Sequence, residues 1–180
     1  MISLLRLVIP GAIALTPSLV SQGNDFLRQQ TVQQLQETRK CFGCNLSRVN
    51  LLGANLEGVD LRSTDLQGAN LKNANLRYAS LEWADLREAN LQGVDLTGAT
   101  LKSTLLVDAD LAGANLEASK LDRADFRNAN LSRANLVNAS RPNDIQNSRS
   151  VILCQTTLPN GVTSNRDCQR SGDRSSTILN

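Results

Sequence analysis

The middle of the chain places a large apolar residue at every fifth position. Leucine holds this position nineteen times in succession from Leu46 to Leu136, except where Phe126 replaces it. The residue two places earlier is small, most often alanine, and the residue between is usually asparagine or aspartate. The other two positions are mostly polar or glycine. The repeating unit therefore has five residues, of which two are suited to a core.

A period of five fits neither an α-helix nor a straight strand. Leucines five residues apart would spread around a helix, and they would alternate between the two faces of a strand. They stay on one side only if the backbone turns by a fixed angle after each unit. Four such corners close one coil, which predicts an all-β, square-sectioned solenoid with 20 residues per coil.

Charged residues give independent support for the 20-residue coil. The position after every fourth leucine alternates in sign, and coils stack about 4.8 Å apart at strand spacing, so these residues form one column of opposite charges: Arg62, Glu82, Lys102 and Asp122. Glu57 and Arg77 are expected to pair in the same way. Residues 44–138 make almost five coils, hence a rod about 23 Å long.

The units Ala54-Asn55-Leu56-Glu57-Gly58 and Ala84-Asp85-Leu86-Arg87-Glu88 resemble those of the pentapeptide-repeat family. The flanking cysteine-containing segments further resemble secreted, cyanobacterial-type members. The resemblance implies a right-handed quadrilateral β-helix of about five coils, with the leucine and the small residue both inward. It implies little about activity, because one fold can carry many functions.

The two ends of the rod need covers, because the end of a solenoid exposes unpaired backbone and apolar side chains. Residues 24–43 are expected to supply a short N-terminal capping helix over Asp25 to Lys40, with Asn24 as its N-cap. Residues 139–168 are expected to form a C-terminal capping hairpin, with a strand at 151–154 and a turn at 158–161. Residues 169–180 are expected to be a disordered tail. With both ends covered, we expect a monomer.

Residues 1–23 have the composition of a signal peptide. Arg6 precedes an apolar run from Leu7 to Leu15 that is short and interrupted by Pro10 and Gly11. An uncleaved anchor is the alternative, since the cleavage site is poorly defined. After cleavage we expect no membrane association, and an exported protein in the periplasm, the thylakoid lumen or the extracellular space.

Four cysteines in an exported chain predict disulfides. The two local pairs, Cys41 with Cys44 and Cys154 with Cys168, lie at opposite ends of a rod that is too long to bridge. Two alternatives exist for the first pair, whose C-x-x-C spacing also occurs in redox motifs and in zinc sites. Against them, the pair follows a helix instead of preceding one, and the chain contains no histidine.

The outer positions offer candidates for contact with a partner protein. Tyr78 and Trp83 are the chain's only tyrosine and tryptophan, and both fall two residues after a leucine, hence outside. Their neighbours one coil away are all small, so each ring either lies flat over the surface or anchors a partner. Leu105 and Val107 are also expected to point outward.

Asp65, Asp85 and Asp125 share one column, which is similar to the family's DNA-mimicking topoisomerase inhibitors. A leucine interrupts the column, arginines follow two of the aspartates, and the whole chain has a net charge of +2. We therefore keep DNA mimicry as an alternative and expect no binding of nucleic acid.

Catalytic chemistry finds no support in the sequence. There is no histidine, no G-x-S-x-G element and no phosphate-binding glycine loop, and the narrow core leaves no room for a cofactor. The sequence predicts a non-enzymatic, exported scaffold or protein-interaction module with an unknown protein partner. A thiol redox protein is the remaining alternative.

Overall fold

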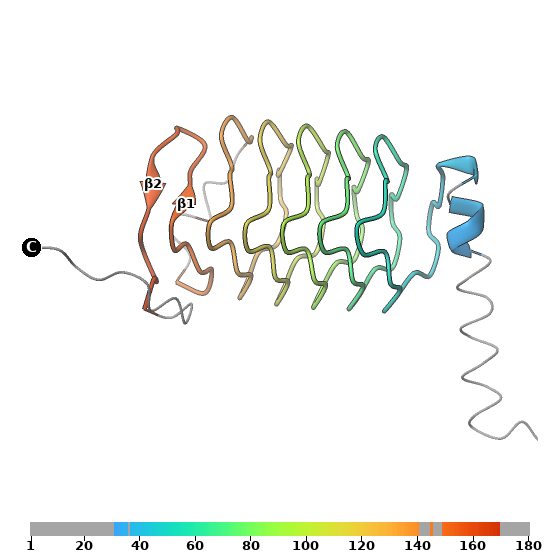
Figure 1. Cartoon of the computed structure of the whole chain (residues 1–180), viewed down its shortest axis with the longest axis horizontal. Coiled ribbons are helices and arrows are strands. Elements are labelled where there is room, and N and C mark those ends of the chain that lie inside the picture. Colours follow the sequence, from blue (N-terminus) through green and yellow to red (C-terminus); the bar gives the residue numbers. More distant parts are fainter. Residues whose placement is uncertain (1–30, 36, 141–144, 146–148, 170–180) are drawn as a thin grey trace, which may run out of the picture.

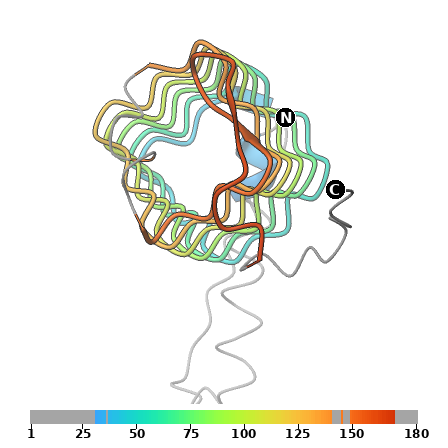
Figure 2. The same cartoon turned by 90° about the vertical axis from the view of Figure 1, so that its left-hand side faces the viewer.

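The computed structural model describes residues 31–35, 37–140, 145 and 149–169. In this part of the chain the backbone winds into a rod of stacked coils, with a short helix at one end and a two-stranded hairpin at the other (Figure 1). Viewed along the rod, successive coils lie over one another and trace a four-sided outline (Figure 2). The predicted signal peptide and most of the predicted C-terminal tail lie outside the described residues.

Parallel bridges between coils define the register. Each joins residues twenty apart, from Lys40 with Asp60 to Lys120 with Ser140, so one coil contains 20 residues, as the charge periodicity predicted. Every bridge is centred on the position between the small residue and the leucine. The ladder begins one unit before the expected start at residue 44, because Lys40 and Cys41 already pair with the next coil.

Each corner of a coil is a tight turn. The leucine carbonyl accepts a hydrogen bond from the amide three residues later, as from Val94 to Leu91 at 3.1 Å. The residue just before that amide, Gly93 in this case, has a φ of 62°. A positive φ at this position is typical of a type II turn and explains why glycine and asparagine are frequent there. The corners also hold bulkier residues in the same conformation, including Tyr78 and Trp83.

The asparagine or aspartate of each unit holds the following corner in place. Its Oδ1 accepts a hydrogen bond from the amide two residues on, for example from Gln92 to Asn90 at 3.2 Å and from Thr97 to Asp95 at 3.0 Å. This is the local bond that makes these two residue types favourable in turns. It accounts for a sequence preference that periodicity alone did not explain.

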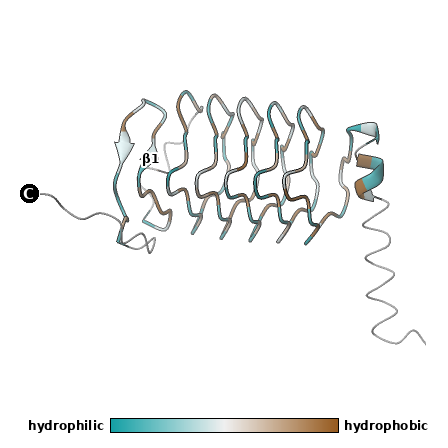
Figure 3. Cartoon of the chain, in the orientation of Figure 1, coloured by the Kyte–Doolittle hydropathy of each residue, from teal (hydrophilic) through white to brown (hydrophobic). Residues whose placement is uncertain are grey.

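The interior is filled by two kinds of side chain. The leucines from Leu61 to Leu116 are fully buried, and the small residues pack beside them. In Figure 3 the hydrophobic colour accordingly recurs at intervals along the coils. Buried hydroxyl groups replace alanine without a penalty where they bond to a carbonyl, as Thr104 Oγ1 does to Leu81 at 2.7 Å and Ser119 Oγ does to Leu116 at 2.7 Å.

The N-terminal helix is described at residues 31–35 and 37–38. Leu35 is fully buried and joins the core of the rod, and Val32 packs against it. The helix ends before the predicted Lys40, because that residue already bridges to Asp60. Its predicted start at Asp25 lies outside the described residues, and no helix in the described part is long and apolar enough to cross a membrane.

The C-terminal segment differs from the prediction in its strand position. The hairpin consists of β1 (Thr156–Thr157) and β2 (Thr163–Ser164), which pair antiparallel, and its turn falls at 158–161 as expected. The strand expected at 151–154 is instead part of a further layer of the solenoid, since Ile152 bridges to Asn130. β1 continues that layer through the bridge from Thr157 to Asn135.

Candidate interaction surface

The column of predicted alternating charges exists as a column but is not held together by the predicted ion pairs. Arg62 binds Asp60 in its own corner, with Nη2 2.7 Å from Oδ2, instead of Glu82 in the next coil. Asp60 also accepts the Arg62 amide at 3.2 Å, so the turn itself brings the two side chains together. These contacts lower the pKa of the Asp60 carboxyl and raise that of the Arg62 guanidinium, the side-chain hydrogen bond being the main cause of both.

A similar change affects the second predicted pair. Arg77 binds Asp95, with Nη1 3.2 Å from Oδ2, and not Glu57. Burial of the Asp95 carboxyl opposes a low pKa, but hydrogen bonds from Thr97 and Arg77 outweigh it and the pKa is lowered. Cross-coil pairing of charges therefore occurs, but along the diagonal that the corner geometry favours.

The aspartate column lies as predicted, since Asp65 bridges to Asp85 and Leu105 bridges to both Asp85 and Asp125. Its charge is largely neutralised. Asp85 and Asp125 each bind the arginine two residues later in a bidentate pair, Arg87 and Arg127. These hydrogen bonds lower the pKa of both carboxyls. A column compensated in this way lacks the strong negative field that imitation of DNA would need.

Tyr78 lies outward, with 58% of its surface exposed, and its ring covers Gly98 of the next coil. A Cβ atom at Gly98 would approach the ring to 2.7 Å, so the glycine makes room for it. The Arg77 guanidinium lies 5.3 Å from the ring centre and donates to the hydroxyl at 3.3 Å. Tyr78 is therefore engaged with its own surface on one face.

Trp83 differs from Tyr78, because 66% of it is exposed and its indole has no hydrogen-bond partner among the described residues. It lines a surface hollow of about 420 Å³ together with Phe42, Arg62, Ser63 and Glu82. Phe42 is 69% exposed, and the sequence analysis did not single it out. The signal was available: reading the five-residue register back by one unit puts Cys41 in the leucine position and Phe42 in the outward position after it.

The predicted outward pair Leu105 and Val107 is exposed to different degrees. Leu105 is 38% exposed, whereas Val107 is half-buried. A larger exposed leucine, Leu52 at 58%, was missed because it follows the inward Leu51 directly. A second hollow of about 430 Å³ lies at the last coils, lined by residues that include Phe126, Ile145 and Val151.

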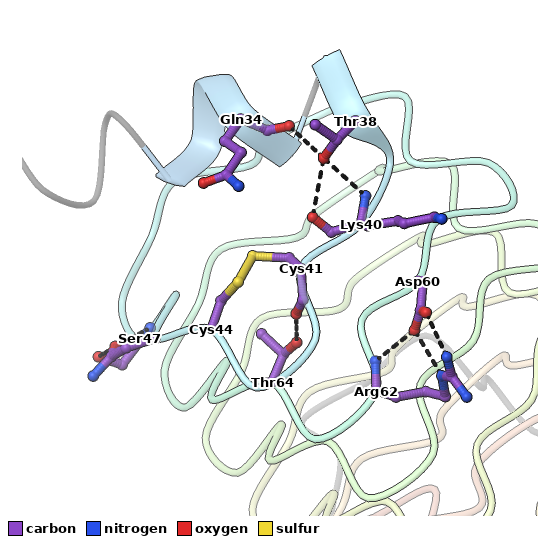
Figure 4. The surroundings of a disulfide bond; sticks show 10 residues. Gln34, Thr38, Lys40, Cys41, Cys44, Ser47, Asp60, Arg62 and Thr64 are labelled. Carbon is purple, nitrogen blue, oxygen red and sulfur yellow. Dashed lines mark hydrogen bonds and ion pairs between the residues drawn. A yellow bond between two sulfur atoms is a disulfide. The ribbon is translucent and has the colours of Figure 1, made fainter.

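All four cysteines form disulfides, Cys41 with Cys44 and Cys154 with Cys168. The first pair closes a corner of the coil beside the end of the N-terminal helix (Figure 4). It joins across the turn the positions that a leucine and a small residue hold elsewhere. No cysteine is free, so the zinc alternative lacks its thiolates in this structure, and no three metal-binding side chains cluster among the described residues.

The comparisons with known proteins identify the family. The profile described as pentapeptide repeats (eight copies) matches residues 40–77, 64–102 and 106–140. The chain therefore belongs to the pentapeptide-repeat family, whose members fold as right-handed β-helices. No curated protein matches.

Solved structures include similar proteins. A pentapeptide repeat protein from the cyanobacterium Cyanothece is 30% identical, with 77% of this chain and 96% of that chain covered and a TM-score of 0.46. HetL from the cyanobacterium Nostoc, described as involved in heterocyst differentiation regulation, is 31% identical, with coverage of 69% and 55% and a TM-score of 0.34. A pentapeptide repeat protein of the Arabidopsis thaliana thylakoid lumen is 25% identical, with coverage of 71% and 83% and a TM-score of 0.36.

Proposed function

We propose that this protein is an exported, non-enzymatic scaffold whose outer surface binds another protein. The observation that supports this most is the exposure of three aromatic side chains, Phe42, Tyr78 and Trp83, in neighbouring columns of the first coils. Exposed aromatic residues on a rigid framework are typical anchors of protein interfaces, because they bury a large area at little cost in conformational entropy.

The interior offers no alternative place for a ligand. Its leucines and small residues are buried against one another throughout the repeats. The surface carboxylates lie beside arginines, and the chain has no histidine, so neither a paired acid and base nor a nucleophile beside a base is evident. Binding on the outer faces is therefore the function that this geometry favours.

Export is part of the same proposal. The two disulfides favour an oxidising compartment, and the apolar segment at the N-terminus has the composition of a signal peptide. If the full chain is expressed in its source organism, the mature protein should be found outside the cytoplasm with an N-terminus near Asn24. Mass spectrometry of the purified protein tests this, and a cytoplasmic chain with reduced cysteines would contradict it.

Affinity capture tests the binding function. Immobilised protein should retain at least one protein from the exported fraction, and the double variant Phe42→Ser, Trp83→Ser should lose it. Glu88→Gln is the matched control, because Glu88 is exposed and lies outside the aromatic columns. Retention of nothing by the parent protein, or equal retention by the double variant, would contradict the proposal.

A further inference from the structure

The hollow beside Trp83 owes its shape to the stacking of the coils. Phe42, Arg62 and Glu82 follow one another in one column, and Ser63 and Trp83 follow in the next. Phe42 and Trp83 are thus about 10 Å apart along the rod, two coil spacings. Ser63 lies between them and is too small to fill the gap, which leaves two ring walls above a shallow floor.

Both walls are held by the backbone and remain open to solvent. Phe42 belongs to a two-residue loop that the disulfide between Cys41 and Cys44 closes. The Trp83 amide donates to the Lys102 carbonyl at 3.1 Å, and Trp83 has a φ of 64°, a conformation that glycine adopts without strain. Strained residues of this kind are frequent at binding sites, where the surrounding structure holds them in place. The walls are therefore preorganised for a guest.

Glu82 supplies the polar feature of the hollow. Its Oε2 atom is shielded from solvent and accepts no hydrogen bond. Neither cation of its column compensates it within the described chain: Arg62 donates to both oxygens of Asp60, at 2.8 and 2.7 Å, and Lys102 forms no ion pair with Glu82. A shielded acceptor without a donor is unfavourable, so a donor that enters the hollow would relieve it.

We infer that the hollow receives a lysine side chain from an exposed segment of the partner protein, an inference that rests on the proposed function. The aliphatic stem would lie between the rings of Phe42 and Trp83, and the ammonium would donate to Glu82. The indole face adds attraction for the cation. The volume of about 420 Å³ accommodates one such side chain with part of its backbone.

Trp83 makes the test direct, because it is the only tryptophan of the chain and its fluorescence reports on the hollow alone. The purified protein is titrated with an acetylated and amidated heptapeptide, Gly-Ser-Ala-Lys-Ala-Ser-Gly, and with the peptides that carry norleucine or glutamate in place of lysine. Only the lysine peptide should give a saturable change in emission. Glu82→Gln should weaken its binding about tenfold or more, because it removes the charge and keeps the shape.

Glu88→Gln is the control, since it removes the same charge from an exposed site where Glu88 accepts from Gln67 at 3.2 Å. It should leave the titration unchanged. Equal binding of the norleucine peptide, an unaltered titration with Glu82→Gln, or no saturable response to the lysine peptide at millimolar concentration would overturn the inference.

The capture experiment separates this inference from the proposed function. If Glu82→Gln retains the partner as well as the parent protein does, while Trp83→Ser does not, the scaffold function stands and the lysine inference fails. If the parent protein retains nothing, the proposed function fails, whatever the peptides show.

Discussion

Leu105 and Leu106 are consecutive residues that lie on opposite sides of the coil wall. Leu106 is fully buried, whereas 38% of Leu105 is exposed. Leu105 bridges to Asp85 on one side and to Asp125 on the other, in the position where other units carry asparagine or aspartate. The same residue type therefore has two unrelated roles at adjacent positions, which makes a matched pair of substitutions possible.

Leu106→Asp should unfold the protein, with a loss of more than about 4 kcal/mol, because it places an unpaired charge in a dry core. Leu105→Asp should change stability by less than about 1 kcal/mol, since it restores the residue type that accepts the next corner's amide. Far-UV circular dichroism and thermal melting compare the two. Equal tolerance of both changes would contradict the inward assignment of the fifth-position leucines.

Asn90→Ala should destabilise the protein by about 0.5–1.5 kcal/mol, because the Gln92 amide loses its acceptor. Asn90→Asp keeps an acceptor at that place and should cost much less. Urea denaturation of both variants measures the difference. If alanine and aspartate had the same effect, the contribution of the side-chain bond to the corner would be disproved.

Gly98→Ala should destabilise through two effects, the positive φ and a clash with the ring of Tyr78. Gly113→Ala is the control, since Gly113 has a φ of +69° and open space around its Cα. Backbone strain alone should cost about 1–2 kcal/mol in both variants, and the excess at Gly98 should disappear when Tyr78 is also replaced by alanine. The absence of any excess would show that the ring moves away freely.

Acid should destabilise the protein below about pH 4. Hydrogen bonds from Arg62, Arg87 and Arg127 lower the folded-state pKa values of Asp60, Asp85 and Asp125. Because the unfolded carboxyls titrate near about 3.9, this stabilisation is complete above that pH and is lost as the pH falls through the folded-state pKa values.

Melting temperatures between pH 2 and 8 measure this effect. The double variant Asp85→Asn, Asp125→Asn keeps the corner acceptors but lacks two ion pairs, so its stability should fall less on acidification. The chain contains no histidine, and we therefore expect little change between pH 5 and 8. An acid loss of the same size in parent and variant would contradict the assignment.

Cys154→Ser together with Cys168→Ser should loosen the hairpin that follows the last repeats. Thr156 Oγ1 donates to the Leu131 carbonyl at 2.6 Å, and the Leu136 amide donates to Thr157 at 2.8 Å, so this segment covers paired backbone at the end of the rod. An uncovered end can pair with a second copy. Light scattering should then detect dimers at rising concentration, whereas the parent protein should be monomeric.

A dimeric parent protein would contradict the capping role from the outset. A variant that stays monomeric and melts like the parent would show that the hairpin does not protect the end.

The five-residue period determined most of the fold. It required a backbone that turns every five residues, and the charge pattern fixed four turns per coil, which the bridges from Lys40 to Thr157 bear out. Burial of Leu91 or Leu106 could also be predicted, because in a solenoid a residue's place in its unit decides whether it points in or out. Local periodicity is sufficient here, since each coil contacts only its neighbours.

The tertiary structure decided the interactions on the surface. Arg62 and Arg77 have carboxylates within reach in the same coil and in neighbouring coils, and only the shape of the corner selects Asp60 and Asp95 as their partners. The hollow likewise depends on three coils, because Phe42 and Trp83 are 41 positions apart and meet only when the coils stack with a small residue between them. Periodicity specifies which side of the wall a residue faces, but contacts between outward side chains depend on their lengths and rotamers, which the repeat does not constrain.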